Sequence, residues 1–200
     1  MTLLTFIIPT KGRASLKETL QSLLHQTRDT WRAIVIGDGH TVKEEYVPED
    51  EKGRITTIRI PKAGRRSNSA GVVRNAGIAK VDTPWIGFVD DDDVVTPNYV
   101  EAFEESLSSN PDVIIFRMQT EKGPVFPPAG AKTFSHSRVG ISFALKTSLC
   151  NEEGFMFEPS RWEDYNLLDA LRKAKKSILM SPHITYIVRP HLKADKEEDK

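Results

Sequence analysis

Short apolar runs alternate with helical segments from Leu3 to Met118, and this alternation restricts the possible folds more than any other feature of the chain. Each run is bounded by Gly, Pro or polar residues, as expected for strands that are covered on both faces. The expected strands are Leu3–Pro9, Ala33–Ile36, Ile55–Ile60, Trp85–Val89 and Val113–Met118. The alternation predicts an α/β fold with a mostly parallel central sheet flanked by helices.

Leucine residues at helical spacing give the segment after the first strand one apolar face. Ser15 and Glu18 form a capping-box pattern at its start, and Thr96 with Pro97 predicts an N-cap and a first-turn proline for a later helix. Further helices are expected over Gly71–Lys80, from Thr96 to about Ser108, and over Glu163–Lys175, and one or two strands over Ser177–Val188.

The chain of 200 residues is expected to form one domain over residues 1–191. Residues 192–200, with the sequence LKADKEEDK, are almost all charged and are expected to be a disordered tail. The stretch from Gly123 to Gly130 is rich in proline and glycine, and no internal repeat is present.

Charge and cysteine content narrow the classes of partner and compartment. The 28 basic and 28 acidic side chains cancel, so nothing indicates nucleic-acid binding or a polybasic membrane anchor. A single cysteine, Cys150, has no intramolecular partner and reads as structural, which favours a reducing compartment. The first apolar run is too short to span a membrane and lacks the features of a signal peptide. We therefore expect a cytoplasmic protein without an integral membrane segment, with peripheral membrane association left open.

Polar residues follow three of the expected strands at the point where each strand ends. Thr10, Asp38 and the block Asp90–Asp93 all lie there, and a doubly wound sheet brings such positions to one edge, where ligands bind. Asp38 stands between two glycines, which let a ligand approach the backbone, so its carboxylate is a candidate for binding a base or sugar. The alternative is an ordinary turn aspartate.

Two acidic segments are candidates for chemistry. Carboxylates are preferred ligands of Mg²⁺ and Mn²⁺, so Asp90–Asp93 suggests a metal-bound phosphate or diphosphate; its position directly behind WIGFV favours this over a solvated helix-capping turn. Acidic residues such as Glu163 and Asp164 are common at the start of a helix, where their charge matches the helix dipole. The pair becomes a catalytic candidate if the reaction removes a proton from an acceptor hydroxyl, because a carboxylate that holds no metal is then needed as the base.

Several weaker candidates remain, each with a structural alternative. Arginines that could bind phosphate could equally be solvated, and Arg74 could brace the fold; these arginines are Arg13, Arg65, Arg66 and Arg74. His183 and His191 are candidates for completing a metal site, although a lone histidine is more often structural. Trp162 is either a platform for stacking a sugar or a core residue.

Four segments together resemble, in order, the blocks of the family 2 glycosyltransferases with the GT-A fold. They are FIIPTKGRASLKETLQSLLHQT, AIVIGDG, VVRNAGIAKVDTPWIGFVDDDDVVTPNYVEAF and WEDYNLLDALRKAKK. The resemblance runs from about Phe6 to His191, and the aspartate block with its TPxY continuation is its most specific part.

The resemblance implies a role for individual positions. Thr10 is similar to the family residue that contacts the nucleoside, and Asp38 to the one that binds the base. Asp90–Asp92 occupies the DxD segment, with Asp92 as the principal metal ligand, and Asp164 matches the catalytic base beside Glu163. We therefore expect donor contacts from Thr10, Arg13, Asp38, Arg74, Asp90, Asp91 and Asp92.

Two departures from the family pattern concern the donor. Gly37-Asp38-Gly39-His40 retains one acidic contact where the family often has two aspartates, and the segment Gly64–Val73 is richer in arginine than usual. Both leave the base and sugar of the donor open.

The resemblance implies a metal-dependent, inverting glycosyltransferase that uses Mn²⁺ or Mg²⁺. It would move a sugar from a nucleotide-diphosphate donor, expected to be a UDP-sugar, to a hydroxyl of a glycan, lipid or other acceptor. The alternative is a non-catalytic sugar-nucleotide-binding domain of a larger protein. A nucleotidyltransferase is disfavoured because Thr10-Lys11-Gly12-Arg13 makes a poor glycine-rich phosphate loop.

Overall fold

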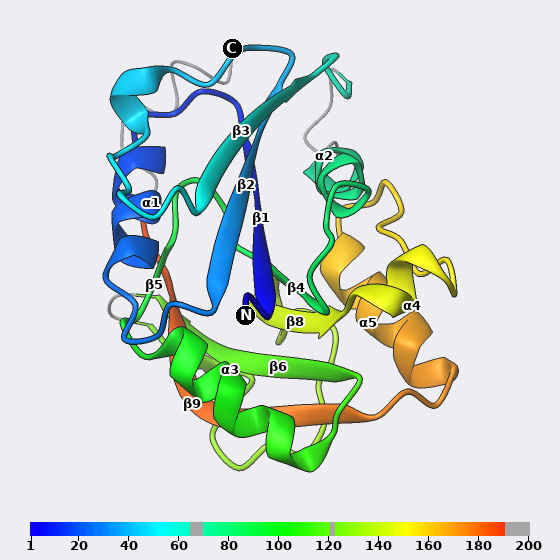
Figure 1. Cartoon of the computed structure of the whole chain (residues 1–200). Coiled ribbons are helices and arrows are strands. Elements are labelled where there is room, and N and C mark those ends of the chain that lie inside the picture. The colour runs from blue at the N-terminus through cyan, green and yellow to red at the C-terminus, as the bar shows by residue number, and fades with distance from the viewer. Residues whose placement is uncertain (65–69, 121–122, 191–200) are drawn as a thin grey trace.

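A computed structural model describes residues 1–64, 70–120 and 123–190 of the chain. Within these residues the strands form one nine-stranded sheet in the order β3-β2-β1-β4-β8-β6-β9-β5, with β7 paired to β6 (Figure 1). The expected tail, His191, and the arginines Arg65 and Arg66 lie outside the described residues.

The elements follow the predicted alternation in the first half of the chain. The strands are β1 (Leu4–Thr10), β2 (Trp31–Asp38), β3 (Ile55–Ile60), β4 (Trp85–Phe88), β5 (Val94–Val95), β6 (Val113–Thr120), β7 (Val125–Phe126), β8 (Phe143–Lys146) and β9 (Ile178–Val188). The α-helices are α1 (Leu16–Leu24), α2 (Ala70–Ile78), α3 (Tyr99–Ser106), α4 (Thr147–Asn151) and α5 (Glu163–Lys173), with short 3₁₀ turns at Glu44–Tyr46 and Leu107–Ser109. The α/β prediction is confirmed.

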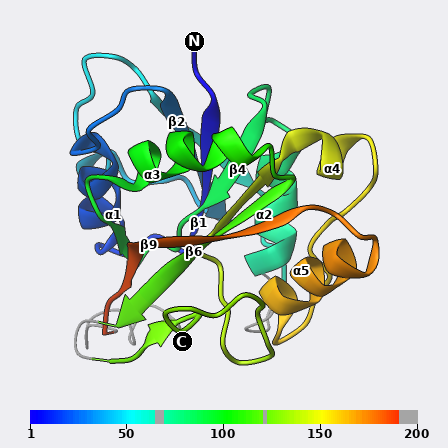
Figure 2. The same ribbon diagram turned by 90° about the horizontal axis from the view of Figure 1, so that it is seen from below.

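The sheet has a parallel part and a mixed part. Strand β1 pairs in parallel with both β2 and β4, and β2 pairs in parallel with β3. Strand β8 then enters antiparallel between β4 and β6, while β9 runs parallel to β6 (Figure 2). Because Thr10 of β1 is in register with Gly37 of β2, the polar residues that end these strands meet at one edge.

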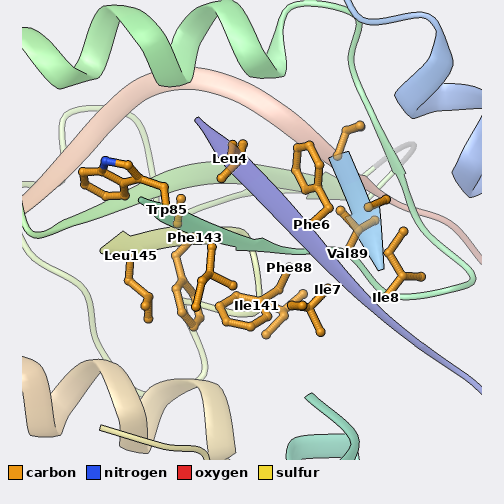
Figure 3. Close-up of a cluster of buried hydrophobic side chains, with 14 of the residues drawn as sticks. Leu4, Phe6, Ile7, Ile8, Trp85, Phe88, Val89, Ile141, Phe143 and Leu145 are labelled. Carbon is orange, nitrogen blue, oxygen red and sulfur yellow. The ribbon is translucent and has the colours of Figure 1, made fainter. Parts of the chain in front are cut away.

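Apolar side chains from the central strands fill the core, as Figure 3 shows for β1, β4 and β8. Every residue of β1 is buried, which explains why its sequence does not alternate between apolar and polar residues. Phe88 packs against Phe143 and Phe157 with ring centroids 5.2 and 5.1 Å apart. Helices α1 and α2 lie on opposite sides of β1–β3 (Figure 1). No helix of the described residues is long and apolar enough to cross a bilayer.

The predicted capping box at Ser15 and the predicted N-cap at Thr96 are wrong, although Ser15 is the N-cap residue of α1. Ser15 has helical backbone angles (φ −56°, ψ −25°) and its buried Oγ has no hydrogen-bond partner in the described residues, while Glu18 forms an ion pair with Arg189 instead of closing a capping box. Helix α3 begins at Tyr99, so Thr96 is not its N-cap; Thr96 donates its hydroxyl hydrogen to the Asn98 side chain at 2.6 Å. At Ser15 and Glu18, the long-range ion pair with Arg189 is formed in place of the local capping box.

Gly77 lets α2 pack closely on the sheet. A Cβ at this position would lie 2.7 Å from Ile36 Cδ1 and 2.9 Å from Ile7 Cγ2. Although alanine favours helix formation over glycine by about 1 kcal/mol, overpacking costs roughly 1–3 kcal/mol. We expect Gly77→Ala to lower the free energy of unfolding, as measured by urea denaturation. An unchanged stability of Gly77→Ala would contradict the close packing.

Candidate active site at the carboxyl edge of the sheet

A cavity of about 430 Å³ lies where the strands β1, β2 and β4 end. It brings together every donor-contact candidate from the sequence and the predicted base; the lining residues include Thr10, Arg13, Asp38, Arg74, Asp90, Asp91, Asp92 and Asp164. Ser160 and Arg161, which precede α5, and Glu163, its first residue, line the same cavity. The cavity therefore joins chain segments that lie far apart in the sequence.

The loop after β1 forms one wall of the cavity. Thr10 Oγ1 accepts a hydrogen bond from the Gly12 backbone N–H at 3.0 Å. Gly12 has a φ of +91°, which favours glycine, and the His40 ring lies where its side chain would be. This turn carries Arg13 to the aspartate block, where its Nη1 lies 3.2 Å from Asp91 Oδ1 and 2.7 Å from Asp92 Oδ2.

Asp38 ends β2 with its side chain buried. Its Oδ1 accepts a hydrogen bond from the backbone N–H of Ala63 at 2.6 Å. That partner lies 25 residues away, beyond β3, so the carboxylate joins two loops rather than closing a local turn. The sequence gives no signal for this contact.

The four aspartates have different surroundings. Asp90 pairs with Arg74 at 2.5 Å, Asp91 and Asp92 face Arg13, and Asp93 accepts a hydrogen bond from the Arg189 backbone N–H at 2.9 Å. Burial raises the pKa of Asp91 to about 6, although a hydrogen bond with Thr10 and the charge of Arg13 oppose the rise. Burial likewise raises the pKa of Asp93 to about 7. Asp93 does not line the cavity.

The carboxylates of the cavity can bind a divalent metal ion only if a bound ligand supplies further oxygen atoms. No group of three His, Cys, Asp or Glu side chains within the described ranges is placed to hold a metal ion. Asp90 and Asp92 both line the cavity, and one or two carboxylates completed by substrate phosphate oxygens is the usual way in which proteins bind Mg²⁺. The pocket thus suits a cation that arrives with a diphosphate.

Sequence reasoning missed two residues near the end of β9 that hold the aspartate block. The Tyr186 hydroxyl accepts a hydrogen bond from the Asp90 backbone N–H at 3.1 Å. Arg189 Nε donates to the Asp92 carbonyl oxygen at 2.7 Å, and its guanidinium also reaches Glu18 and the Ser15 carbonyl oxygen. Asp90 and Tyr186 are 96 residues apart, and Asp92 and Arg189 are 97 residues apart. No local sequence pattern therefore predicts these contacts.

Glu163 and Asp164 differ in how their oxygens are used. Glu163 Oε1 forms an ion pair with Arg74, and its Oε2 accepts a hydrogen bond from the Gly71 N–H at 2.9 Å. Asp164 Oδ1 lies 3.8 Å from Arg74 Nη1 and accepts no hydrogen bond within the described residues. Burial raises the pKa of Asp164 to about 7, although Arg74 opposes the rise. Of the two residues, only Asp164 keeps a carboxylate oxygen without a hydrogen-bond partner in the described part of the chain, and this oxygen is buried beside Arg74.

The remaining candidates lie outside this arrangement. His183 Nε2 is 3.2 Å from Glu105, and His183 does not line the cavity. Trp162 is 40% exposed and its ring centroid lies 4.2 Å from that of His136, so it is not a core residue, and stacking of a sugar stays a prediction. Cys150 is buried in α4, and burial raises the pKa of its thiol to about 12, which agrees with a structural role.

A family model described as Glycosyl transferase family 2 matches residues 5–175. The succinoglycan biosynthesis protein ExoW of Rhizobium meliloti is 33% identical over 116 residues, which are 54% of this chain and 35% of that protein. The uncharacterized glycosyltransferase EpsJ of Bacillus subtilis is 27% identical over 117 residues, which are 56% of this chain and 33% of that protein. The chain thus spans about a third of the length of these curated relatives.

Solved structures share the fold. S. aureus TarS 1-349 in complex with UDP-GlcNAc superimposes with a TM-score of 0.74 at 18% identity, covering 96% of this chain and 59% of that one. The mannosyltransferase PcManGT from Pyrobaculum calidifontis, in complex with GDP-Man and Mn²⁺, gives a TM-score of 0.65 at 14% identity, covering 92% of this chain and 56% of that one.

Proposed function

The chain belongs to glycosyl transferase family 2 and has the GT-A fold, and from this membership we propose that it is a metal-dependent, inverting glycosyltransferase. It transfers a sugar from a nucleotide-diphosphate donor, a UDP-sugar, to a hydroxyl group of a glycan or lipid-linked acceptor. One observation carries the proposal: Asp90, Asp91 and Asp92 after β4 line the same cavity as Asp164, which keeps one oxygen without a hydrogen-bond partner in the described residues.

The donor half of the cavity binds the nucleotide. Asp38 and Thr10 contact the nucleoside from the ends of β2 and β1, and Asp90 and Asp91 contact the ribose and diphosphate. Asp92 would hold the cation, and bound Mn²⁺ or Mg²⁺ would neutralise the charge of the diphosphate leaving group. Arg13, which now pairs with Asp92, adds positive charge beside the phosphates.

Asp164 is the general base of the reaction. It takes the proton of the acceptor hydroxyl while the oxygen attacks the anomeric carbon from the side opposite the diphosphate, so the configuration at that carbon inverts. Glu163 is unsuited to this task because Arg74 and the Gly71 N–H already occupy its two oxygens. The different use of their oxygens supports different tasks for the two acidic residues.

The named relatives support the finer parts of the proposal. TarS was solved with UDP-GlcNAc, PcManGT with GDP-Man and Mn²⁺, and ExoW is named for succinoglycan biosynthesis. These favour a nucleotide-sugar donor, a bound cation and a polysaccharide product. These named relatives do not favour the alternative of a binding domain without activity. A cytoplasmic location and a single domain over residues 1–191 are part of the proposal.

Release of the nucleotide diphosphate tests the proposal. We expect the chain to release UDP from at least one of UDP-GlcNAc, UDP-glucose and UDP-galactose when Mn²⁺ and a panel of oligosaccharides and alkyl glycosides are present. Chelation of the metal should lower the rate at least about 100-fold, because a metal ion stabilises the leaving group by several kcal/mol. GDP-mannose serves as the control donor. Tight binding of UDP-sugars without turnover of any donor and acceptor pair would instead indicate the binding domain.

A further inference from the structure

Helix α2 contacts the segment of residues 157–164, which contains the proposed base Asp164. Asn75 forms two hydrogen bonds with the Phe157 backbone: its Nδ2 donates to the carbonyl oxygen at 2.8 Å and its Oδ1 accepts from the N–H at 3.0 Å. One turn earlier, the Gly71 N–H donates to Glu163 Oε2 at 2.9 Å. Residues 157–164 are thus attached to α2 at both ends, and α2 lies beside the parallel half of the sheet (Figure 1).

Gly71 is required for this close approach. A Cβ at position 71 would lie 2.5 Å from Glu163 Oε2 and 2.9 Å from Phe157 Cβ. Any larger residue would displace the Glu163 carboxylate and push the two segments apart. The glycine therefore belongs to the docking contact, in addition to its place in the first turn of α2.

Arg74 lies between the two contacts that attach residues 157–164 to α2, and its guanidinium faces carboxylates of the protein. The residue is only 4% exposed. Its Nη2 pairs with Asp90 at 2.5 Å, its Nη1 pairs with Glu163, and the same nitrogen lies 3.8 Å from Asp164. Its guanidinium also stands over the Phe157 ring, 5.4 Å from the centroid. Little of the side chain is left to meet a phosphate.

We propose that Arg74 is a positioning residue: it fixes Asp164 relative to the donor-binding aspartates, and it is not a ligand of the donor phosphates. This inference rests on the proposed function. Asp90, Glu163 and Asp164 would repel one another without a cation among them, since two like charges about 4 Å apart interact by roughly 4 kcal/mol at an effective dielectric of about 20. The planar fork of arginine can hold carboxylates on two chain segments at once, which the single ammonium of lysine cannot do with the same geometry.

Three variants separate positioning from ligand binding. Arg74→Met removes the charge, Arg74→Lys keeps the charge but not the fork, and Gly71→Ala keeps Arg74 and displaces Glu163. Arg28→Met is the matched control, because Arg28 is 52% exposed at its side chain and pairs with Glu101 on the surface. The readouts are kcat at saturating donor, the Kd of UDP by calorimetry, and amide hydrogen exchange of residues 157–164.

We expect kcat to fall at least about 100-fold in Arg74→Met and Gly71→Ala, because a displacement of about 1 Å can cost that much, with Arg74→Lys in between. The Kd of UDP should change less than about threefold. Exchange of residues 157–164 should rise at least about tenfold, and Arg28→Met should resemble the wild type in all three readouts.

The opposite division would overturn the inference: a Kd of UDP raised about tenfold or more, with kcat and exchange kept, would make Arg74 a phosphate ligand. If Arg74→Met does not fold, Arg74→Lys and Gly71→Ala decide the question. If the wild type transfers no sugar, the proposed function fails, whereas hydrogen exchange still shows whether Arg74 holds the segment.

Discussion

Asp164→Asn should lower kcat by about 10²- to 10⁴-fold, the range that a general base commonly contributes. Asparagine has the shape of aspartate but cannot take a proton from the acceptor hydroxyl. Because the substitution preserves volume and Asp164 accepts no hydrogen bond at Oδ1 within the described residues, the fold and the Kd of UDP should change little. Initial rates at saturating donor and calorimetric UDP binding measure the two effects separately.

The matched control for this variant lies in the same helix. Asp169→Asn makes the same chemical change in α5 at a residue that pairs with Lys173 at 2.8 Å on the surface, where ion pairs contribute little. Its kcat should stay close to that of the wild type. Near-full transfer by Asp164→Asn with normal donor binding would show that another group acts as the base.

The same residue sets a pH dependence. Burial raises the pKa of Asp164 from its ordinary value of 3.8 to about 7, so below that pH most molecules carry a protonated, inactive base. We expect kcat to rise with pH up to about 7 and then to level off. The residual activity of Asp164→Asn should lack this rise, and a rise that persists in the variant would assign it to a different group.

Asp92→Ala should abolish the tightening of UDP binding by Mn²⁺. Interactions with a charged group contribute about 1.5–3 kcal/mol each, so the loss corresponds to roughly 10- to 150-fold in Kd. Calorimetric titrations of UDP with Mn²⁺ and with a chelator give the two values for each variant. In Asp92→Ala the two values should coincide.

Asp93→Ala is the control for position within the aspartate block. Its carboxylate faces the Arg189 N–H rather than the cavity, so the variant should keep the effect of Mn²⁺ on UDP binding. It should instead lose about 1–3 kcal/mol of stability, because the partly buried Arg189 N–H is left without its acceptor. Equal losses of donor binding in the two variants would contradict this division of the block.

The parts of the fold that follow from local pattern could be predicted from the sequence. The continuous apolar runs of β1 and β4 and the helical spacing of α1 gave their positions to within a residue or two. The same strand ends predicted that Thr10, Asp38 and the aspartate block would meet, because parallel strands share one carboxyl edge.

The parts that depend on distant contacts could not be predicted. Strand β8 enters the sheet antiparallel between β4 and β6, and its short sequence carries no signal for that place. The capping box at Ser15 fails because Glu18 has a distant ion-pair partner, Arg189. The acidic pattern by itself does not distinguish Glu163 from Asp164 as the base, and only the family resemblance favours Asp164; the proposal adds which oxygens Arg74 and Gly71 occupy.

The attachment of the aspartate block to the end of β9 has a consequence for the order of events during synthesis. Asp90 and Asp93 meet their partners Tyr186 and Arg189 only after 96 further residues have been made. At about 5–20 residues per second, a ribosome needs roughly 5 to 20 s to supply them. Until then the nascent chain can pair β1 with β2 and β4, but Asp90 and Asp93 lack their hydrogen bonds with Tyr186 and Arg189. The cavity is therefore among the last parts of the molecule to reach its final structure, and a chain interrupted before β9 would carry all of the acidic residues that line the cavity without these two contacts.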